Sequence, residues 1–439
     1  MKPIKSLIAL TLGSMLAATP ALAKTELQLQ RFFGACEAEY GQNTNVDKAT
    51  GECGIMTSLI NKFNAEHPDI DVKVTTVEWP GYDQLTAQMA SRNPPDLVTM
   101  HDSVISDYQS RNLLLPIDDL LKQAGVNPSD LTSTAKDGVT RDGQVYGLPL
   151  DTWTMLYHIN MNLMKQAKQV DADGQPMLPS SPEELLEQAR QFKQATGKPY
   201  FVQILANETA AYTRLLYTYL FQQDSDFFAA PNKISLKGNE KAKNVVKVFK
   251  QIYDEDLTTK NMDYPATVSS FTNGEGGILL NGNWLLSSFD AQAHKKGSPL
   301  FEGYMAEPYP QLLYSGSKAS YVDGHAWVMP AKKRDKEKLA ATAEFFKFMA
   351  NNNSQWARTG HLPSVKAVLS DEAFLQLPNR KNLLSVTQTG KGLPSGVKRQ
   401  FAIQDIIGEE LAAAITGGKS IDEALADAEY RVNDMLAHL

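Results

Sequence analysis

The chain lacks three features that would place it in a common class at once: many cysteines, a long hydrophobic run and a standard catalytic motif. Only Cys36 and Cys53 carry thiols among 439 residues. Beyond the N-terminus there is no run of about 18 consecutive apolar residues, which excludes an ordinary membrane-spanning helix there. The motifs G-x-S-x-G, H-E-x-x-H and the Gly-rich P-loop are absent, so the hydrolases, zinc proteases and phosphate binders that carry them are excluded as well.

Positive charge is also scarce. The formal net charge is −7, and it becomes −9 if Lys2 and Lys5 are removed with the first 23 residues. An acidic chain without a basic run is a poor partner for nucleic acids or anionic membrane surfaces. Removal of 23 from 439 residues leaves 416, which is enough for two domains.

Residues 1–23, MKPIKSLIALTLGSMLAATPALA, have the parts of a secretory signal peptide. Lysines precede an apolar segment that is too short to span a bilayer, and Ala21-Leu22-Ala23 forms an A-x-A cleavage site. Gly, Ser, Thr and Pro interrupt the apolar segment, which argues against a retained anchor helix. We therefore expect cleavage after Ala23 and a periplasmic protein.

The compartment bears on the role of Cys36 and Cys53. A lipid anchor is disfavoured, because the polar KTELQLQR separates FGAC from the apolar segment. A metal site would need more soft ligands nearby, and no His occurs in residues 1–66. A catalytic thiol would need a base, which one sequence cannot identify. Because exported proteins form disulfides, we predict a Cys36–Cys53 disulfide in a protein that is not a lipoprotein.

Hydrophobic periodicity predicts alternating strands and helices near the N-terminus. The pattern predicts strands at 25–33, 69–79 and 94–100, with helices at 55–68 and 82–93 between them. This order favours a parallel sheet in an α/β lobe. No repeat or low-complexity linker separates two domains, so we expect the chain to pass between them more than once.

Aromatic residues recur beside carboxylates or amides in predicted loops. Carbohydrate recognition needs this pairing, because the apolar face of a sugar stacks on a ring while its hydroxyls bind carboxylates and amides. Taken singly, each pair is better explained by a core aromatic beside a capping acid, so only the cluster favours sugar binding. The pairs are Glu78-Trp79, Asp151-Thr152-Trp153, Asn281 to Trp284 and Asp323 to Trp327.

Several segments, in order, resemble the maltose-binding-protein-like sugar binders among the extracellular solute-binding proteins of ABC importers. The most specific match is SFTNGEGGILLNGNWLLSSF, which is similar to the family pattern F-x-x-G-x-x-A-M-x-x-x-G-x-W. The other matching segments are LINKFNAEHPDIDVKV, PPDLVTMHD, DGQVYGLPLDTWTMLYHINMNLM, HAWVMPAKKRDKEKLAATAEFFKFM and SIDEALADAEYRV. Together they cover essentially all of the chain after the signal peptide.

The resemblance implies an α/β, two-lobed periplasmic binding protein fold. Its hinge-connected lobes would be crossed by the chain about three times and close on a ligand in a central cleft. The implied division is residues 24–134 plus 312–352 for lobe 1 and 135–311 plus 353–439 for lobe 2.

The resemblance also implies a set of ligand-binding residues. Trp284 takes the place of a stacking tryptophan, and Asp102 lies where the family often uses Asp to bind sugar hydroxyls. The remaining positions that the resemblance assigns to the cleft are Glu78, Trp79, Tyr82, Asp151, Trp153, Glu208, Tyr212, Gly324 and His325.

Two departures from the family pattern affect this assignment. The loop from Gly34 to about Gly54 is longer than usual, and it either contributes Glu37, Glu39 or Tyr40 to the ligand or is only a braced surface loop. Near the C-terminus RQFAIQDIIGEE lacks a stacking tryptophan, and Gln404 or Asp405 lies about where one would be. We therefore expect a ligand smaller than, or shaped differently from, a linear maltodextrin.

The sequence thus predicts a monomeric, non-enzymatic binding protein that delivers a neutral mono- or oligosaccharide, or a glycosylated polyol, to an ABC permease. It predicts no cofactor, no metal and no nucleic-acid partner. One alternative is a secreted carbohydrate-active enzyme that uses a pair of carboxylates such as Asp102 and Asp151. The other is a binder of an anionic sugar derivative, for which Arg31, Arg214 and Arg358 are available.

Overall fold

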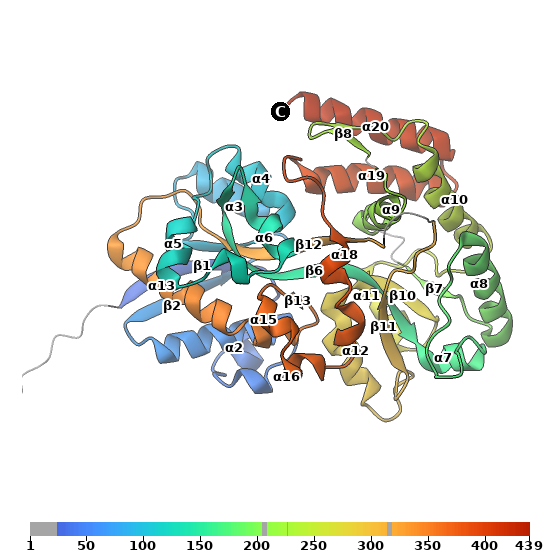
Figure 1. The fold of residues 1–439 in the computed structure, drawn as a ribbon, viewed down its shortest axis with the longest axis horizontal. Coiled ribbons are helices and arrows are strands. Elements are labelled where there is room, and N and C mark those ends of the chain that lie inside the picture. Colours follow the sequence, from blue (N-terminus) through green and yellow to red (C-terminus); the bar gives the residue numbers. More distant parts are fainter. Residues whose placement is uncertain (1–23, 204–208, 226, 314–317) are drawn as a thin grey trace, which may run out of the picture.

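The computed structural model describes residues 24–203, 209–225, 227–313 and 318–439. The predicted signal peptide and Glu208 lie outside the described residues. Two lobes lie side by side, with the N-terminal strands in one and the C-terminal helices in the other (Figure 1). Within the described residues, no helix combines the length and the apolar character needed to cross a bilayer.

One mixed sheet of ten strands runs through both lobes. Its main path is β2 (Ile70–Thr76), β1 (Thr25–Arg31), β3 (Leu97–His101), β12 (Ser320–Val328), β6 (Gly147–Asn160), β10 (Ile278–Gly282) and β7 (Phe201–Val202). β11 (Tyr304–Pro308) and β13 (Leu362–Pro363) also pair with β6, and β14 (Gly390–Lys391) pairs with β12. The first three strands are parallel, as the sequence predicts, whereas β6 and β12 are antiparallel to each other.

The N-terminal lobe has its own apolar core. Leu27 and Leu29 of β1, Phe63 of α2 and Phe345 of α13 all belong to it and are fully or almost fully buried. The helices and short strands that precede β6 are α1 (Glu37–Tyr40), η1 (Val46–Lys48), α2 (Gly51–Glu66), α3 (Tyr82–Ala90), α4 (Asp102–Gln109), α5 (Asp118–Ala124), η2 (Pro128–Asp130), α6 (Ser133–Val139), β4 (Thr140–Arg141) and β5 (Gln144–Val145), and α13 (Lys336–Asn351) and α14 (Asn353–Ala357) follow β12.

The second lobe surrounds another apolar core, to which Tyr157, Phe201, Tyr219 and Ile407 contribute fully buried side chains. The helices and short strands between β6 and β12 are α7 (Met161–Gln166), α8 (Pro182–Thr196), α9 (Ala210–Gln222), β8 (Phe228–Ala230), β9 (Lys233–Ile234), α10 (Glu240–Asp254), α11 (Tyr264–Thr272), η3 (Asn283–Leu285) and α12 (Leu286–Ala293), and the last helices are α15 (Lys366–Leu369), α16 (Glu372–Leu375), α17 (Arg380–Leu383), α18 (Val386–Thr389), α19 (Gln400–Ile415) and α20 (Ile421–Ala437).

β6 and β12 connect the two cores. On β6, Leu150 packs in the first core and Tyr157 in the second. On β12, Trp327 packs in the first core and Tyr321 in the second. These strands therefore carry residues from one lobe to the other, and their middle residues lie at the junction. The lobe boundaries at 134, 311 and 352 stay a prediction.

Local sequence signals explain much of this architecture. The Ser181 side chain accepts a hydrogen bond from the Glu184 amide at 3.1 Å, and Gly197 ends α8 in the left-handed conformation. The predicted disulfide is confirmed: Cys36 and Cys53 are bonded, which ties α1 to the start of α2.

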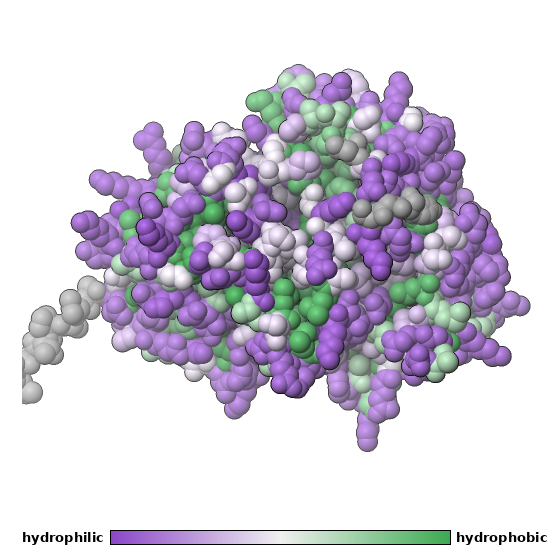
Figure 2. Space-filling model, viewed as in Figure 1, coloured by the Kyte–Doolittle hydropathy of each residue, from purple (hydrophilic) through white to green (hydrophobic). Residues whose placement is uncertain are grey.

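On the face shown in Figure 2 the surface is mostly hydrophilic, and residues of intermediate hydropathy gather where the lobes meet.

Candidate functional site

The middle of the β6–β12 pair places four predicted site residues between the lobes. Asp151 lies opposite His325, and Trp153 lies opposite Asp323. Since side chains alternate along a strand, Asp151 and Trp153 point to the same face of β6. Gly324 lies between them on β12, where a Cβ would collide with the Asp102 carboxylate.

The two tryptophans that the sequence assigns to the ligand are in contact. The ring centroids of Trp153 and Trp284 are 5.6 Å apart with the rings nearly perpendicular. Trp284 Nε1 donates a hydrogen bond to Tyr264 Oη at 2.9 Å. The Arg214 guanidinium lies 4.9 Å from the centroid of the Trp153 ring, in cation–π geometry. An aromatic corner with polar groups beside it thus forms on this face.

Gln404 is also part of this corner. Its side-chain oxygen accepts a hydrogen bond from Arg214 Nε at 3.2 Å, and its backbone oxygen accepts one from the Thr213 hydroxyl at 2.6 Å. Gln404 therefore orients the arginine that lies over Trp153.

His101 and Phe401 join the first lobe to this corner, and sequence reasoning missed both. The His101 ring lies 6.4 Å from Trp153, 5.8 Å from Trp79 and 5.0 Å from Phe401, centroid to centroid. Tyr82 Oη contacts His101 Nδ1 at 2.6 Å and accepts the His101 amide hydrogen at 2.9 Å. The only local signal was the position of His101 immediately after the third predicted strand.

The mouth of this region is formed by Trp79 and Phe401. Trp79 is 54% exposed, follows β2, and lies 5.9 Å from Phe401 of α19. A cavity of about 20 Å³ lies further in, lined in part by Met155, Gln203 and Tyr212. A cavity of that size accommodates about one water molecule and is too small for a sugar in this conformation.

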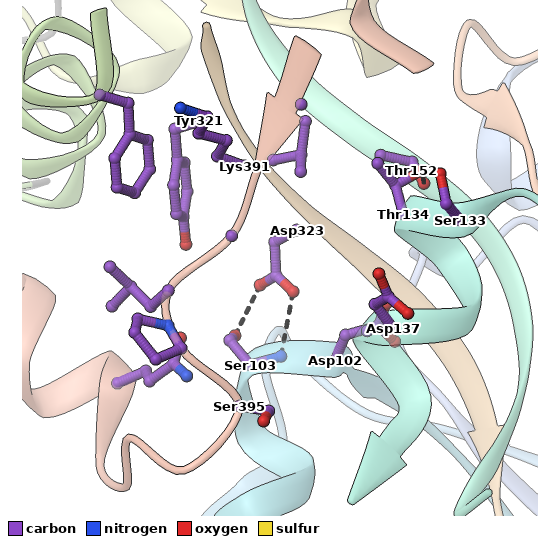
Figure 3. Close-up of a pocket in the computed structure, with 18 of the residues that line it drawn as sticks. Asp102, Ser103, Ser133, Thr134, Asp137, Thr152, Tyr321, Asp323, Lys391 and Ser395 are labelled. Carbon is purple, nitrogen blue, oxygen red and sulfur yellow. Dashed lines mark hydrogen bonds between the residues drawn. The ribbon is translucent and has the colours of Figure 1, made fainter. Parts of the chain in front are cut away.

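Asp102 lies in a different, larger cavity. This cavity has a volume of about 850 Å³, which is within the usual range for small-molecule pockets, and both lobes line it. Ser103 donates to Asp323 from its amide at 3.0 Å and from its hydroxyl at 2.6 Å (Figure 3). Thr152 lines this cavity, whereas Trp153 and Trp284 do not. The structure therefore brings the two tryptophans together but gives the Asp102 carboxylate a separate pocket.

The carboxyl groups in the larger cavity are strongly perturbed. Burial and the neighbouring Asp323 raise the pKa of Asp102 well above its usual value. Burial also raises the pKa of Asp323, although the hydrogen bonds from Ser103 oppose this effect. Arg141 Nη2 donates to the backbone oxygen of Asp102 at 2.7 Å, so this guanidinium is held beside the pair.

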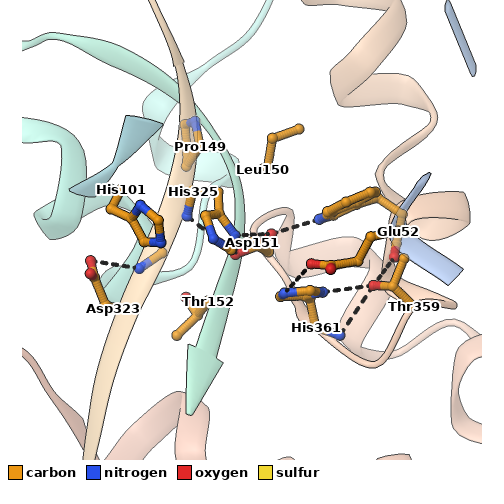
Figure 4. Close-up of polar contacts among 12 residues, drawn as sticks. Glu52, His101, Pro149, Leu150, Asp151, Thr152, Asp323, His325, Thr359 and His361 are labelled. Carbon is orange, nitrogen blue, oxygen red and sulfur yellow. Dashed lines mark hydrogen bonds and ion pairs between the residues drawn. The ribbon is translucent and has the colours of Figure 1, made fainter. Parts of the chain in front are cut away.

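Asp151 is fully buried among hydrogen-bond donors (Figure 4). Its oxygens lie 3.0 Å from His325 Nδ1, and Trp356 Nε1 donates to Oδ2 at 2.6 Å. Burial lowers the pKa of His325, but the facing Asp151 carboxylate outweighs it, so that pKa lies above its usual value. The carboxylate is thus contacted by His325 and Trp356 and is not exposed to a solute between the lobes.

The remaining predicted residues lie at the edges of the interlobe region. Glu78 is exposed beside Trp79. Glu37 is exposed as well, 3.6 Å from Arg31 Nη2, and accepts a hydrogen bond from the Thr76 hydroxyl. The cysteine loop therefore contacts the ends of β1 and β2 through Glu37.

The model of the bacterial extracellular solute-binding protein family matches residues 58–382. The sn-glycerol-3-phosphate-binding periplasmic protein UgpB of Escherichia coli O6:K15:H31 (strain 536) is 24% identical, covering 99% of this chain and 98% of its own length.

Two solved structures illustrate the fold. The GacH receptor of Streptomyces glaucescens, studied unliganded and with acarbose, matches with a TM-score of 0.76 and 19% identity over 94% of this chain and 99% of its own. UgpB of Mycobacterium tuberculosis in complex with glycerophosphocholine matches with a TM-score of 0.74 and 16% identity over 95% of this chain and 99% of its own.

Proposed function

Because the chain belongs to the bacterial extracellular solute-binding protein family, we propose that it is the periplasmic substrate-binding component of an ABC importer and that its solute is a neutral sugar or glycosylated polyol. The solute is captured between the lobes and delivered to a membrane permease. No bond is made or broken in this cycle, and the protein acts as a monomer after cleavage of residues 1–23.

The contact between Trp153 and Trp284 carries this proposal. Indole rings offer the apolar faces on which sugar rings stack, and Arg214, Gln404 and Tyr264 supply polar groups beside them. We assign the ligand to this aromatic corner, with Tyr212 further in. Trp79 and Glu78 would complete the site at the mouth.

Hinge closure supplies the mechanism. The aromatic contacts between Phe401 and the first lobe hold the lobes together on this face. A solute that contacts both lobes stabilises the closed form because an open form lacks half of those contacts. We propose residues 24–134 plus 312–352 and 135–311 plus 353–439 as the two lobes that move.

An anionic solute is the second candidate, and Arg214 is the observation that favours it. Among the three arginines considered from the sequence, Arg31 donates to the backbone oxygen of Gly34 and to Thr57, and Arg358 donates to backbone oxygens of Val46 and Ala49. Arg214 lies over Trp153 in the aromatic corner and donates from Nε to Gln404, and we propose it as the cation that a bound phosphate or carboxylate would face. The relatives named for glycerol 3-phosphate and glycerophosphocholine make this class worth testing.

The arrangement of the carboxylates does not favour the enzyme alternative. A glycosidase needs two carboxyl groups that flank one sugar bond. Asp102 lines the larger cavity, whereas Asp151 is held by His325 and Trp356. We therefore propose no catalytic role for either carboxylate.

The proposal is tested by thermal unfolding of the mature chain against a panel of neutral sugars, glycosyl polyols, sugar acids and glycerol phosphoesters. A solute at 100 times its dissociation constant should add about 2.7 kcal/mol of stability. Small-angle scattering would then show whether that solute changes the population of closed lobes. Trp284→Ala should abolish the shift, whereas Tyr430→Ala, at a position 72% exposed on α20, should preserve it. Absence of a shift with every solute would contradict the proposal.

A further inference from the structure

We propose that Asp151, His325, His361 and Glu52 form a zinc site where the strands that cross between the lobes meet the disulfide-bonded loop. The sequence predicts no metal site, because these residues lie far apart in it. The proposed site does not require a bound solute. It requires only that the four side chains stay together.

The four donor groups lie close together and are of the chemical types that bind zinc. One donor atom from each of Asp151, His325 and His361 lies within 4.8 Å of the others, and all three residues are buried. Glu52 Oε1 lies 3.4 Å from His361 Nε2 and supplies a fourth donor. Imidazole nitrogens and carboxylate oxygens are both zinc ligands, and four such donors match the coordination number that zinc prefers.

The hydrogen bonds of Thr359 fix the tautomer of His361. The Thr359 hydroxyl has one hydrogen, and it donates that hydrogen to the backbone oxygen of Trp356 at 2.7 Å. Its contact with His361 Nδ1 at 2.8 Å must therefore be a bond in which the ring nitrogen donates. With Nδ1 carrying the proton, a neutral His361 has its lone pair on Nε2.

That lone pair points at negative groups (Figure 4). His361 is fully buried, and among the described residues its Nε2 atom has no hydrogen-bond partner. The nearest acceptor is the Glu52 carboxylate, with Asp151 close by. Apart from a proton on Glu52 itself, no described group can donate a hydrogen to this lone pair. A cation bound among these atoms would take the lone pair in place of that proton.

The surroundings resemble those of built metal sites. A ligating histidine usually donates its other ring nitrogen to a neighbouring oxygen, as His361 does to Thr359. Ligating carboxylates are usually hydrogen-bonded as well, as Asp151 is to Trp356 Nε1. The Glu52 side chain is 28% exposed, so an ion can reach the site past it.

The origin of the ligands indicates what the ion would do. Asp151 and His325 belong to β6 and β12, His361 precedes β13, and Glu52 lies in α2 beside Cys53. One zinc ion would therefore connect β6, β12 and the segment before β13 with the disulfide-bonded loop that ends at Glu52 and Cys53. This gives the disulfide a second role, which is to hold the Glu52 ligand in place.

Titration calorimetry tests the site on the full mature chain after dialysis against a chelator. We expect one zinc ion per chain, a higher melting temperature with zinc, and visible absorption typical of tetrahedral cobalt when Co²⁺ replaces Zn²⁺. His361→Gln and, near the surface, Glu52→Gln should each weaken zinc binding. Thr359→Val removes the oxygen that orients His361 and should weaken it by about 10- to 100-fold. His294→Gln, at the end of α12, is the matched control and should bind zinc as the unmodified chain does.

The outcomes are decisive in both directions. Stoichiometric binding that is lost in Glu52→Gln and His361→Gln, with unchanged circular dichroism, supports the site. Absence of zinc binding in the unmodified chain overturns it, and so does equal affinity in the unmodified chain and in a folded Glu52→Gln variant. Because no solute is present in these experiments, they leave the proposed transport function untouched whichever way they fall.

Discussion

The ring of Phe401 lies 5.0 Å, centroid to centroid, from the imidazole of His101. Phe401 begins α19 of the second lobe, whereas His101 ends β3 of the first, so this contact exists only while the lobes are close. Tyr82 extends it, since its ring lies 5.7 Å from that of Phe401. The side of the molecule that holds the aromatic corner is therefore closed by an aromatic contact.

Removal of the Phe401 ring should shift the unliganded protein toward the open form. Phe401→Ala deletes contacts that only the closed form makes, so it lowers the stability of that form alone. We expect a larger radius of gyration in small-angle scattering of the unliganded variant and a weaker solute affinity. Tyr430→Ala removes an exposed ring from α20 and serves as the control. Identical scattering from Phe401→Ala and the unmodified protein would contradict the prediction.

The charge on Arg214 should separate the two solute classes. Arg214→Met keeps an apolar side chain over Trp153 but removes the cation. Removal of one partner of a desolvated charge pair commonly costs about 2–5 kcal/mol, so the affinity for a phosphoester should fall by more than about tenfold.

A neutral sugar should lose much less affinity in the same variant, because it loses no charge pair. Isothermal titration with the best solute of each class measures the difference. The Arg358→Met variant is the control, because its guanidinium binds backbone oxygens of the cysteine loop. A phosphoester that binds Arg214→Met and the unmodified chain equally would exclude Arg214 as its anion receptor.

The disulfide should contribute measurably to stability. A crosslink that closes a loop of this length stabilises a protein by about 3 kcal/mol in the chain-entropy model. The double variant Cys36→Ser, Cys53→Ser should therefore unfold at lower urea concentration, and the unmodified protein should approach it in the presence of a reductant. If the reductant leaves the unfolding midpoint of the unmodified protein unchanged, the bond adds nothing to the folded state.

Local signals explain why part of the fold was predictable. The alternation of Leu27 and Leu29 predicts β1, and the Ser181 cap with Gly197 predicts the ends of α8, because these features depend on neighbours in the sequence. The disulfide was predicted only from the expected export of the chain, because exported proteins form disulfides. Each of these inferences needs no knowledge of tertiary contacts, and the structure confirms all of them.

The site was less predictable because its contacts join distant segments. His101 and Phe401 meet only after both lobes have formed, and nothing in RQFAIQ marks the phenylalanine. Asp102 follows β3 as expected, yet the direction of its side chain depends on the packing of Gly324 and α6 around it. The role proposed for His361 depends on its contact with Thr359 and on the nearby Asp151. These residues come together because β13 pairs with β6.

Stability should depend on pH through Glu307 of β11. Burial raises the pKa of this carboxyl group to about 7, although Asn382 Nδ2 donates a hydrogen bond to Oε1 at 2.7 Å. Because the folded-state pKa lies above the unfolded value of 4.5, the folded state binds the proton more tightly. The resulting stability is fully present below the unfolded pKa and is lost as the pH rises through about 7.

Glu307→Gln should therefore match the unmodified protein near pH 4 and exceed it in free energy of unfolding by about 3 kcal/mol near pH 8. Glutamine keeps an oxygen for Asn382 while it avoids the buried charge. Urea unfolding at several pH values measures the difference, with Glu187→Gln on the exposed face of α8 as the control. A stability difference that stays constant from pH 4 to pH 8 would mean that Glu307 does not take up a proton in the folded chain.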